Sequence, residues 1–436
     1  MSVSGLRASA DFGQLGQDMH EFVSELYPIC RSITGAGIRE TLHRIQRKVP
    51  LRIHEVASGT PVFDWIVPNE WTIREAYVKN EQGERIIDFR RHNLHVWSYS
   101  TAVDRTMTLD ELKSHLASIP EHPDWIPYRT SYYKENWGFC LSHKQLLALK
   151  PGNYTVCIDT TLQPGSLSYG EYVIPGRTDE TVFLSTHCCH PSLCNDNLSG
   201  IATATYLAKL LSDAQPRYTY KFVFIPGTIG AITWLAQNEH TVRHIKHGFV
   251  VAGGGDGGSF HYKQSRRGNA EVDQIVEQVL RDSGHPHKVV PFSPYGYDER
   301  QYCSPGFNLP VGALSRTPHG QFAEYHTSAD NLDFVTAEHM AQTLAVYVSV
   351  ISALEANHRY QNVNPKCEVQ LGKRGLYRQT GGHTDQPLRE SAILWLLNMS
   401  DSEHTMLDIV KKSGLPYDVL ISAANELLAQ NLIQVT

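Results

Sequence analysis

The sequence lacks the features that define several classes of protein. No apolar run reaches 18 residues, roughly the minimum for a transmembrane helix, and residues 1–14 carry one arginine but no apolar core of a signal peptide. The net charge of −6 gives no general attraction to nucleic acid or to an anionic membrane. The eight cysteines form neither a Cys-x-x-Cys pair nor a disulfide framework. We therefore expect a reduced, cytoplasmic protein that spans no membrane and binds no nucleic acid.

The length and apolar content predict a multidomain fold. The chain has 436 residues, of which 41% are apolar, enough for about two to three domains with a substantial core. Its residue pattern predicts N-terminal helices (1–50), a β-rich domain (51–147), an α/β domain (148–360), a linker (361–386) and a C-terminal module (387–436). Nothing in the sequence fixes the oligomeric state, and a homo-oligomer is compatible with it.

Residues 148–360 alternate between apolar strands and helical patterns. Continuous apolar strands between helices are typical of sheets that are buried on both faces. We therefore predict an α/β fold with a mixed, mostly parallel sheet covered by helices. The expected strands are 154–158, 181–184, 221–225, 248–252 and 311–314.

The C-terminal module has the pattern of a winged helix-turn-helix. Three short helices over 388–398, 405–413 and 417–430 precede a strand at 432–435. Residues 385–436 contain three basic and seven acidic side chains. Because DNA affinity depends on cationic contacts to phosphate, this acidic module favours a role in packing or oligomerisation over DNA binding.

One strand-end loop carries metal-binding side chains. His187 and Asp196 lie between an apolar run at 181–184 and a helical pattern at 201–211. Imidazole and carboxylate are good zinc ligands, and loops at strand ends are where α/β enzymes place their chemistry. The alternative interpretation is packing or loop hydrogen bonding.

Several neighbours in this loop leave alternatives open. Cys188, Cys189 and Cys194 could act as soft metal ligands, although a Cys-x-x-Cys pair is absent. His190 could also be a ligand, but its neighbour Pro191 favours a turn.

The same residues resemble a known family. Thr-His-x-x-His-Pro-Ser followed by Asn-Asp-Asn-Leu-Ser-Gly, within residues 186–200, is similar to the zinc aminopeptidases of the M28 type. It is more similar still to a bacterial subgroup of aminopeptidase-like proteins associated with polysaccharide biosynthesis. The resemblance covers roughly residues 16 to 436. It implies a zinc-exopeptidase-like domain with an inserted β domain and a C-terminal winged helix, and a Zn²⁺ cofactor held by His187, Asp196 and His326.

The resemblance breaks at the residues expected to perform catalysis. M28 enzymes place two adjacent glutamates after the next strand, one as general base and one as metal ligand. Residues 224–231 of this chain read Phe-Ile-Pro-Gly-Thr-Ile-Gly-Ala and contain no carboxylate. Related members of the subgroup can carry a glutamate at the position of Gly227. The missing carboxylates favour one zinc ion over two and leave the general base to be supplied from elsewhere.

Other acidic residues could supply that base or a further ligand. Asp298 and Glu299 lie on a loop similar to one in the subgroup. Glu324 lies two residues before His326, so on an extended segment both side chains face the same side. Asp256, in a glycine-rich loop after the strand at 248–252, is a candidate ligand, with a turn role as the alternative.

The candidate substrate-binding residues are basic or aromatic. Arg266 and Arg267 could bind a substrate carboxylate through paired hydrogen bonds, or form a solvated pair. Tyr262 and Arg300 complete the set.

The sequence predicts a zinc-dependent hydrolase of an amide or peptide bond, aminopeptidase-like, acting on a small aminoacyl-type substrate. The alternative is a non-catalytic, metal-containing binding protein derived from an aminopeptidase. A transcriptional regulator is a third class, and the acidic C-terminal module disfavours it.

Overall fold

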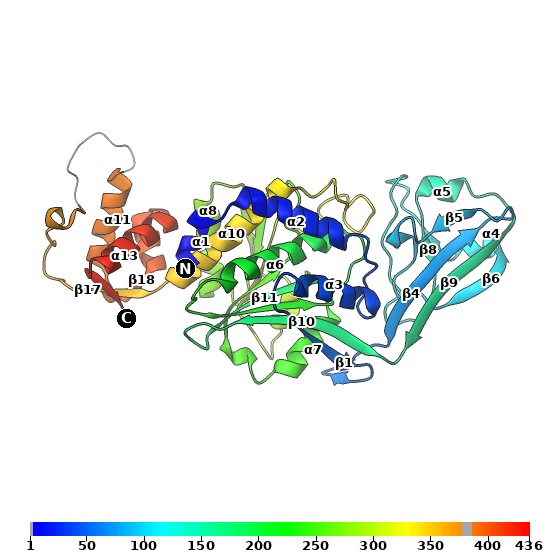
Figure 1. The fold of residues 1–436 in the computed structure, drawn as a ribbon, viewed down its shortest axis with the longest axis horizontal. Coiled ribbons are helices and arrows are strands. Elements are labelled where there is room, and N and C mark those ends of the chain that lie inside the picture. Colours follow the sequence, from blue (N-terminus) through cyan, green and yellow to red (C-terminus); the bar gives the residue numbers. More distant parts are fainter. Residues whose placement is uncertain (1–2, 377–385) are drawn as a thin grey trace.

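The computed structural model describes residues 3–376 and 386–436, and Figure 1 shows three units in a row. A central α/β unit is flanked by a small β unit at one end and a helical C-terminal unit at the other. Among the described residues, no helix has both the length and the apolar character needed to cross a membrane.

The central unit is built on an eight-stranded sheet, and the predicted mixed α/β class is confirmed. Four adjacent strands in its middle, β12, β11, β13 and β16, are parallel, while the outer pairs β1–β10, β10–β12 and β16–β14 are antiparallel. The strand order is β1 (Arg52–Ala57), β10 (Ser166–Ile174), β12 (Thr219–Ile225), β11 (Thr181–His187), β13 (Ile245–Val251), β16 (Val311–Ser315), β14 (Phe260–Lys263) and β15 (His287–Val290).

Helices cover both faces of this sheet because successive strand residues point to opposite sides. In β11, Val182 and Leu184 pack into one apolar cluster and Phe183 into another. The first cluster lies under α1 (Val3–Ser9), α2 (Phe12–Leu26), α3 (Ala36–Gln46), α6 (Ser199–Ser212), α8 (Glu271–Asp282) and α10 (Ala337–Ala356). The second lies under α7 (Ile229–Asn238), η3 (Val242–His244) and α9 (Glu299–Tyr302).

The small β unit shares a long hairpin with the central sheet. Its sheet has the order β5 (Arg85–Asp88), β4 (Glu70–Lys79), β9 (Asn153–Gln163) and β6 (Val103–Thr108). Strand β9 turns directly into β10 of the central sheet, and β1 also belongs to that sheet. The structure thus shifts the predicted limits 51 and 147, because β1 lies in the central sheet and β9 completes the small one. The unit also contains η1 (Asn93–His95), α4 (Leu109–Lys113), β7 (Leu116–Ala117), β8 (Phe139–Cys140) and α5 (His143–Leu147), and the β2 (Pro61–Val62) and β3 (Trp65–Ile66) hairpin precedes β4.

The C-terminal unit packs three helices beside a three-stranded sheet. Its elements are β17 (Arg359–Asn362), η4 (Gly372–Arg374), α11 (Gln386–Met399), β18 (Asp401–Thr405), α12 (Met406–Ser413), α13 (Tyr417–Ala429) and β19 (Ile433–Val435). The three predicted helices and the last strand are present. Because β17 pairs with β18 and β19, the unit begins before the predicted limit at 387. Part of the predicted linker, residues 377–385, lies outside the described residues.

One buried side chain joins this unit to the α/β unit. Asn357, 7% exposed, accepts hydrogen bonds at Oδ1 from the backbone N–H of Leu407 (2.9 Å) and from the Tyr417 hydroxyl (3.2 Å). Its Nδ2 donates to Glu271 Oε1 at 2.8 Å. The asparagine therefore satisfies polar groups on both sides of the junction.

Replacing Asn357 by alanine should destabilise the protein by about 1–3 kcal/mol, because the buried Leu407 N–H loses its partner. Urea unfolding followed by circular dichroism measures the loss. Asn364→Ala, at an exposed asparagine in the same unit, should change the free energy of unfolding by less than about 0.5 kcal/mol. Equal effects of the two substitutions would contradict the proposed junction.

Candidate metal centre

Three segments bring imidazole and carboxylate groups to one edge of the sheet. His187 is the last residue of β11, and His190 follows in the next loop. Asp196 lies in η2 (Cys194–Leu198), which leads into α6. His326 comes from the loop after β16. Since β11 and β16 run parallel, their carboxyl ends meet at the same edge.

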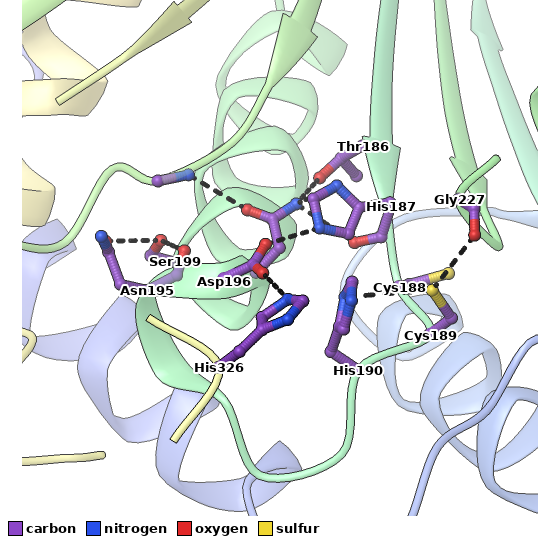
Figure 2. Close-up of polar contacts among 12 residues, drawn as sticks. Thr186, His187, Cys188, Cys189, His190, Asn195, Asp196, Ser199, Gly227 and His326 are labelled. Carbon is purple, nitrogen blue, oxygen red and sulfur yellow. Dashed lines mark hydrogen bonds and ion pairs between the residues drawn. The ribbon is translucent and has the colours of Figure 1, made fainter. Parts of the chain in front are cut away.

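These side chains converge on one point, as Figure 2 shows. Asp196 contacts His187 Nε2 through Oδ1 (2.8 Å) and His326 Nε2 through Oδ2 (2.9 Å). One ligand atom each from His187, His190 and Asp196 lies within 4.8 Å of the others. We call His187, His190, Asp196 and His326 the metal cluster. Three imidazoles and a carboxylate suit a transition metal such as zinc.

The electrostatics of the metal cluster favour the ligand forms of Asp196 and His190, whereas the raised pKa of His187 favours its protonated form. Burial alone would raise the pKa of Asp196, but His190, His187 and His326 hold it well below its usual range. Burial lowers the pKa of His190 to about 3, so its imidazole is neutral. Burial alone would lower the pKa of His187, but its bond to Asp196 raises it. Metal ligation needs an ionised carboxylate and neutral imidazoles.

A buried hydrogen-bond network fixes the ligand loop. Asp330 accepts from the backbone N–H groups of Asn195 (2.6 Å) and Asp196 (3.0 Å). Asn197 Nδ2 donates to Thr186 Oγ1 at 2.9 Å and to the His187 carbonyl at 3.1 Å. His326 has φ of +56°, a conformation that is rare outside glycine and is often held in place at functional sites.

His190 is the cluster member that the sequence disfavoured, since Pro191 favours a turn. The structure places it in the metal cluster, with its ring centroid 5.1 Å from those of both His187 and His326. Three tyrosines, absent from the predicted site, surround these rings. Tyr128 lies edge-on to His190 and His326, Tyr297 stacks on His187, and Tyr325 stacks on His326. Only His-x-x-His spacing could have pointed to His190, and no sequence signal marks the tyrosines.

Asp256 requires a correction, because its carboxylate faces hydrogen-bond donors instead of the metal cluster. Its Oδ2 accepts from Asn195 Nδ2 (2.8 Å), and its Oδ1 accepts from the Gly258 N–H (2.6 Å) and the Thr317 hydroxyl (3.1 Å). With both oxygens engaged, Asp256 supports the loop beside Asn195, the turn role that the sequence left open.

The cysteines near the metal cluster are structural. Burial raises the pKa of Cys188 and Cys194 well above the usual value and that of Cys189 to about 12. None of the three belongs to the group of close ligand atoms formed by His187, His190 and Asp196. Cys188 Sγ donates to the Ile225 carbonyl, and Cys189 Sγ lies 3.7 Å from the Gly227 carbonyl oxygen.

Asp298 lies where the missing glutamate would have pointed. A Cβ built on Gly227 would lie 3.4 Å from Asp298 Oδ2 and 3.2 Å from the Cβ of His187. Asp298 is 1% exposed, and neither carboxyl oxygen has a hydrogen-bond partner among the described residues. Burial raises its pKa to about 7. A buried carboxyl without a partner, next to a histidine of the metal cluster, is a candidate acid–base group.

The other two candidate bases do not reach the metal cluster. Glu299 is buried and forms an ion pair with Lys263. Glu324 is half-buried, and its backbone carbonyl accepts from Thr327. Neither carboxylate contacts a cluster residue within the described chain.

The predicted substrate-binding residues are also corrected. Tyr262 is fully buried and donates to Asp273 at 2.8 Å, so it is a core residue. Arg266 and Arg267 bond to the side chain and carbonyl of Asn308, away from the cluster. Of the four predicted residues, only Arg300 lies near the site, because its charge lowers the pKa of Asp298.

Two family models match the chain. The first, described as a domain of unknown function (DUF4910), matches residues 20–357, and the second, described as winged helix-turn-helix, matches residues 358–435. The chain belongs to the DUF4910 family. The second match confirms the predicted winged helix and begins at the edge of β17.

A relative from Clostridium acetobutylicum matches nearly the whole chain. This protein, provisionally named a polysaccharide biosynthesis protein with an aminopeptidase-like domain, is 51% identical over 421 residues, which cover 97% of each chain. A crystal structure of a protein provisionally named a peptidase, from the same organism, has a TM-score of 0.93 at 49% identity and covers 98% of each chain. The resemblance to aminopeptidase-like proteins is therefore confirmed.

The DUF4910 fold also resembles that of M28 aminopeptidases. A zinc aminopeptidase of Bacillus subtilis has a TM-score of 0.56 at 11% identity, with 77% of this chain and 94% of that chain covered. An M28 peptidase precursor of Shewanella amazonensis has a TM-score of 0.55 at 15% identity, covering 81% and 97%. At these identities the likeness concerns the fold alone.

Replacing His190 by alanine should lower the affinity for Zn²⁺ by about 100-fold or more. Loss of a residue that only hydrogen-bonds to a ligand typically costs about 10–100-fold. Titration against a chromophoric chelator measures the affinity. His240→Ala, at an exposed histidine, should leave it unchanged. An unchanged affinity in His190→Ala would indicate that His190 is a turn residue and not a metal ligand.

Proposed function

We propose that this protein is a zinc-dependent, aminopeptidase-like hydrolase that cleaves an amide or peptide bond in a small aminoacyl-type substrate. The observation that carries the proposal is the convergence of His187, His190, Asp196 and His326 beside the unpartnered carboxyl of Asp298. The aminopeptidase-like domain named in the 51% identical relative supports the same reaction class.

The metal cluster would hold one zinc ion. Its donors at His187 and Asp196 are buried, with Asp196 ionised and His190 neutral, so the cluster fits a divalent metal without the two glutamates of the M28 pattern. Zinc held there supplies Lewis acidity, which polarises a carbonyl and acidifies water.

Asp298 acts as the general base in this proposal. It accepts a proton from the water that attacks the substrate carbonyl and passes that proton to the nitrogen of the leaving amine. The C–N bond breaks, and the products are an amine and a carboxylic acid. Gly227 has no side chain, so position 227 supplies no second carboxylate beside Asp298.

Removal of zinc should abolish hydrolysis of aminoacyl p-nitroanilides, and re-addition of Zn²⁺ should restore it. Asp196→Ala should fall to background, since it removes the residue that joins His187 and His326. Release of p-nitroaniline and elemental analysis of the same samples check both results. Full activity in metal-free protein would overturn the proposal.

Asp298→Asn should lower kcat by about 10²–10⁴-fold, the usual contribution of a general base, while the bound zinc stays constant. Adding Gly227→Glu to Asp298→Ala should recover part of the activity, because a side chain at 227 starts within 3.4 Å of Asp298 Oδ2. Asp213→Asn, at an exposed aspartate, is the matched control. An unchanged kcat in Asp298→Asn would show that another group is the general base.

A second candidate is a metal-containing binding protein without turnover. Gly227 favours it, since the position carries no carboxylate. Zinc-loaded, folded protein that hydrolyses none of a panel of aminoacyl amides would select this candidate.

A further inference from the structure

A cavity of about 260 Å³ lies beside the metal cluster, and none of the relatives' names refers to it. Its floor is one face of three strands at the edge of the central sheet, β15, β14 and β16. Residues paired in register share a face, which places Lys288 beside His261 and Ser315, and Val290 beside Lys263 and Ala313. We call this cavity the side pocket.

Tyr297 and His319 connect the side pocket to the metal cluster. Tyr297 lines the pocket, and its ring stacks on His187 with centroids 5.3 Å apart. His319 lines it too and contacts Tyr297 at 4.8 Å. The side pocket and the metal cluster therefore share the Tyr297 ring as a common wall. The volume is below the roughly 300–1,000 Å³ of sites for drug-sized ligands, so one amino-acid side chain is a suitable occupant.

The side pocket contains donors that have no protein partner within the described chain. The Tyr297 hydroxyl is buried and has no hydrogen-bond partner among the described residues. Among the described residues, neither the Lys288 ammonium nor the His319 ring has a polar partner. A buried hydroxyl without a partner costs free energy, which a ligand oxygen would recover.

The carboxylate that lines the pocket is ion-paired through Oε1, while its Oε2 has no hydrogen-bond partner among the described residues. Glu299, fully buried, pairs with Lys263, which also donates to the carbonyls of Ser293 (3.2 Å) and Tyr295 (3.0 Å). Lys288, an exposed residue that also lines the pocket, adds a second positive charge that no described acidic side chain pairs with. Free donors and a net positive charge suit an anionic acceptor, and charge-assisted bonds to a carboxylate are the strongest that these groups can form.

We propose that the side pocket binds the acidic side chain of the substrate's N-terminal residue, with Lys288 and Tyr297 as its recognition groups. This inference rests on the proposed function, which assigns an amide or peptide bond to the rest of the substrate. It makes the protein selective for acidic aminoacyl groups, with Lys288 as a specificity residue that does not take part in bond cleavage.

Calorimetric titration of the zinc-loaded full chain with L-glutamate and L-glutamine tests the proposal, because the two ligands differ only in the group that enters the pocket. Glutamate should bind about tenfold or more tightly than glutamine. Lys288→Gln should remove that preference without weakening glutamine. Lys288→Arg should keep it, and Lys366→Gln, at an exposed lysine outside the pocket, should leave both affinities unchanged.

Equal affinities for the two ligands, no measurable binding of glutamate, or an equal loss for both in Lys288→Gln would overturn the proposal. Hydrolysis of glutamyl and leucyl p-nitroanilides separates this outcome from failure of the proposed function. Hydrolysis without preference for the glutamyl substrate refutes the side pocket and leaves the hydrolase intact. Selective glutamate binding without any hydrolysis refutes the hydrolase and leaves the side pocket intact.

Discussion

A buried carboxylate that needs compensation organises the centre of this protein. Asp196 is 1% exposed, and burying an ionised group without partners is too costly to tolerate. Two imidazoles from distant segments, His187 and His326, meet its oxygens. The end of β11, the start of α6 and the loop after β16 are thus held together by one charge, and a cation placed among the same groups would reinforce this arrangement.

The motif around Asp196 also positions the neighbouring strand end. Asn197 Oδ1, Ser199 Oγ and Asn195 Oδ1 accept from the successive backbone N–H groups of residues 253–255. The glycines there are required by close packing, since a Cβ on Gly255 would lie 2.8 Å from the side chain of Val335. The polar residues that flank the metal ligand therefore satisfy the backbone of the loop after β13, which would otherwise be buried without partners.

Sequence patterns predicted the sheet, the helices and three cluster residues because those depend on periodicity and on the position of a residue at a strand end. The corrected residues share another property. Asp256 and Tyr262 are engaged by Asn195 and Asp273, partners far enough away in the chain that spacing does not reveal them. The domain limits shifted for a related reason, since the residues of β1 and β17 pair with residues at least 40 positions away in the chain. Residue type sets what a side chain can do, but its partners decide what it does.

Asp298 and Glu299 show the same rule at adjacent positions. Both carboxyls are buried at the start of one short helix, α9. Glu299 is neutralised by Lys263, so it shapes the side pocket and leaves the positive charge of Lys288 unopposed. Asp298 points to the opposite side, toward Gly227 and His187, where burial keeps its pKa near 7. A single turn of chain thus separates a group suited to proton transfer from one suited to charge compensation. Because residue 227 is glycine, Asp298 is the carboxyl next to that position. The loop after β15 therefore carries the proposed base, and it also forms a wall of the proposed recognition site.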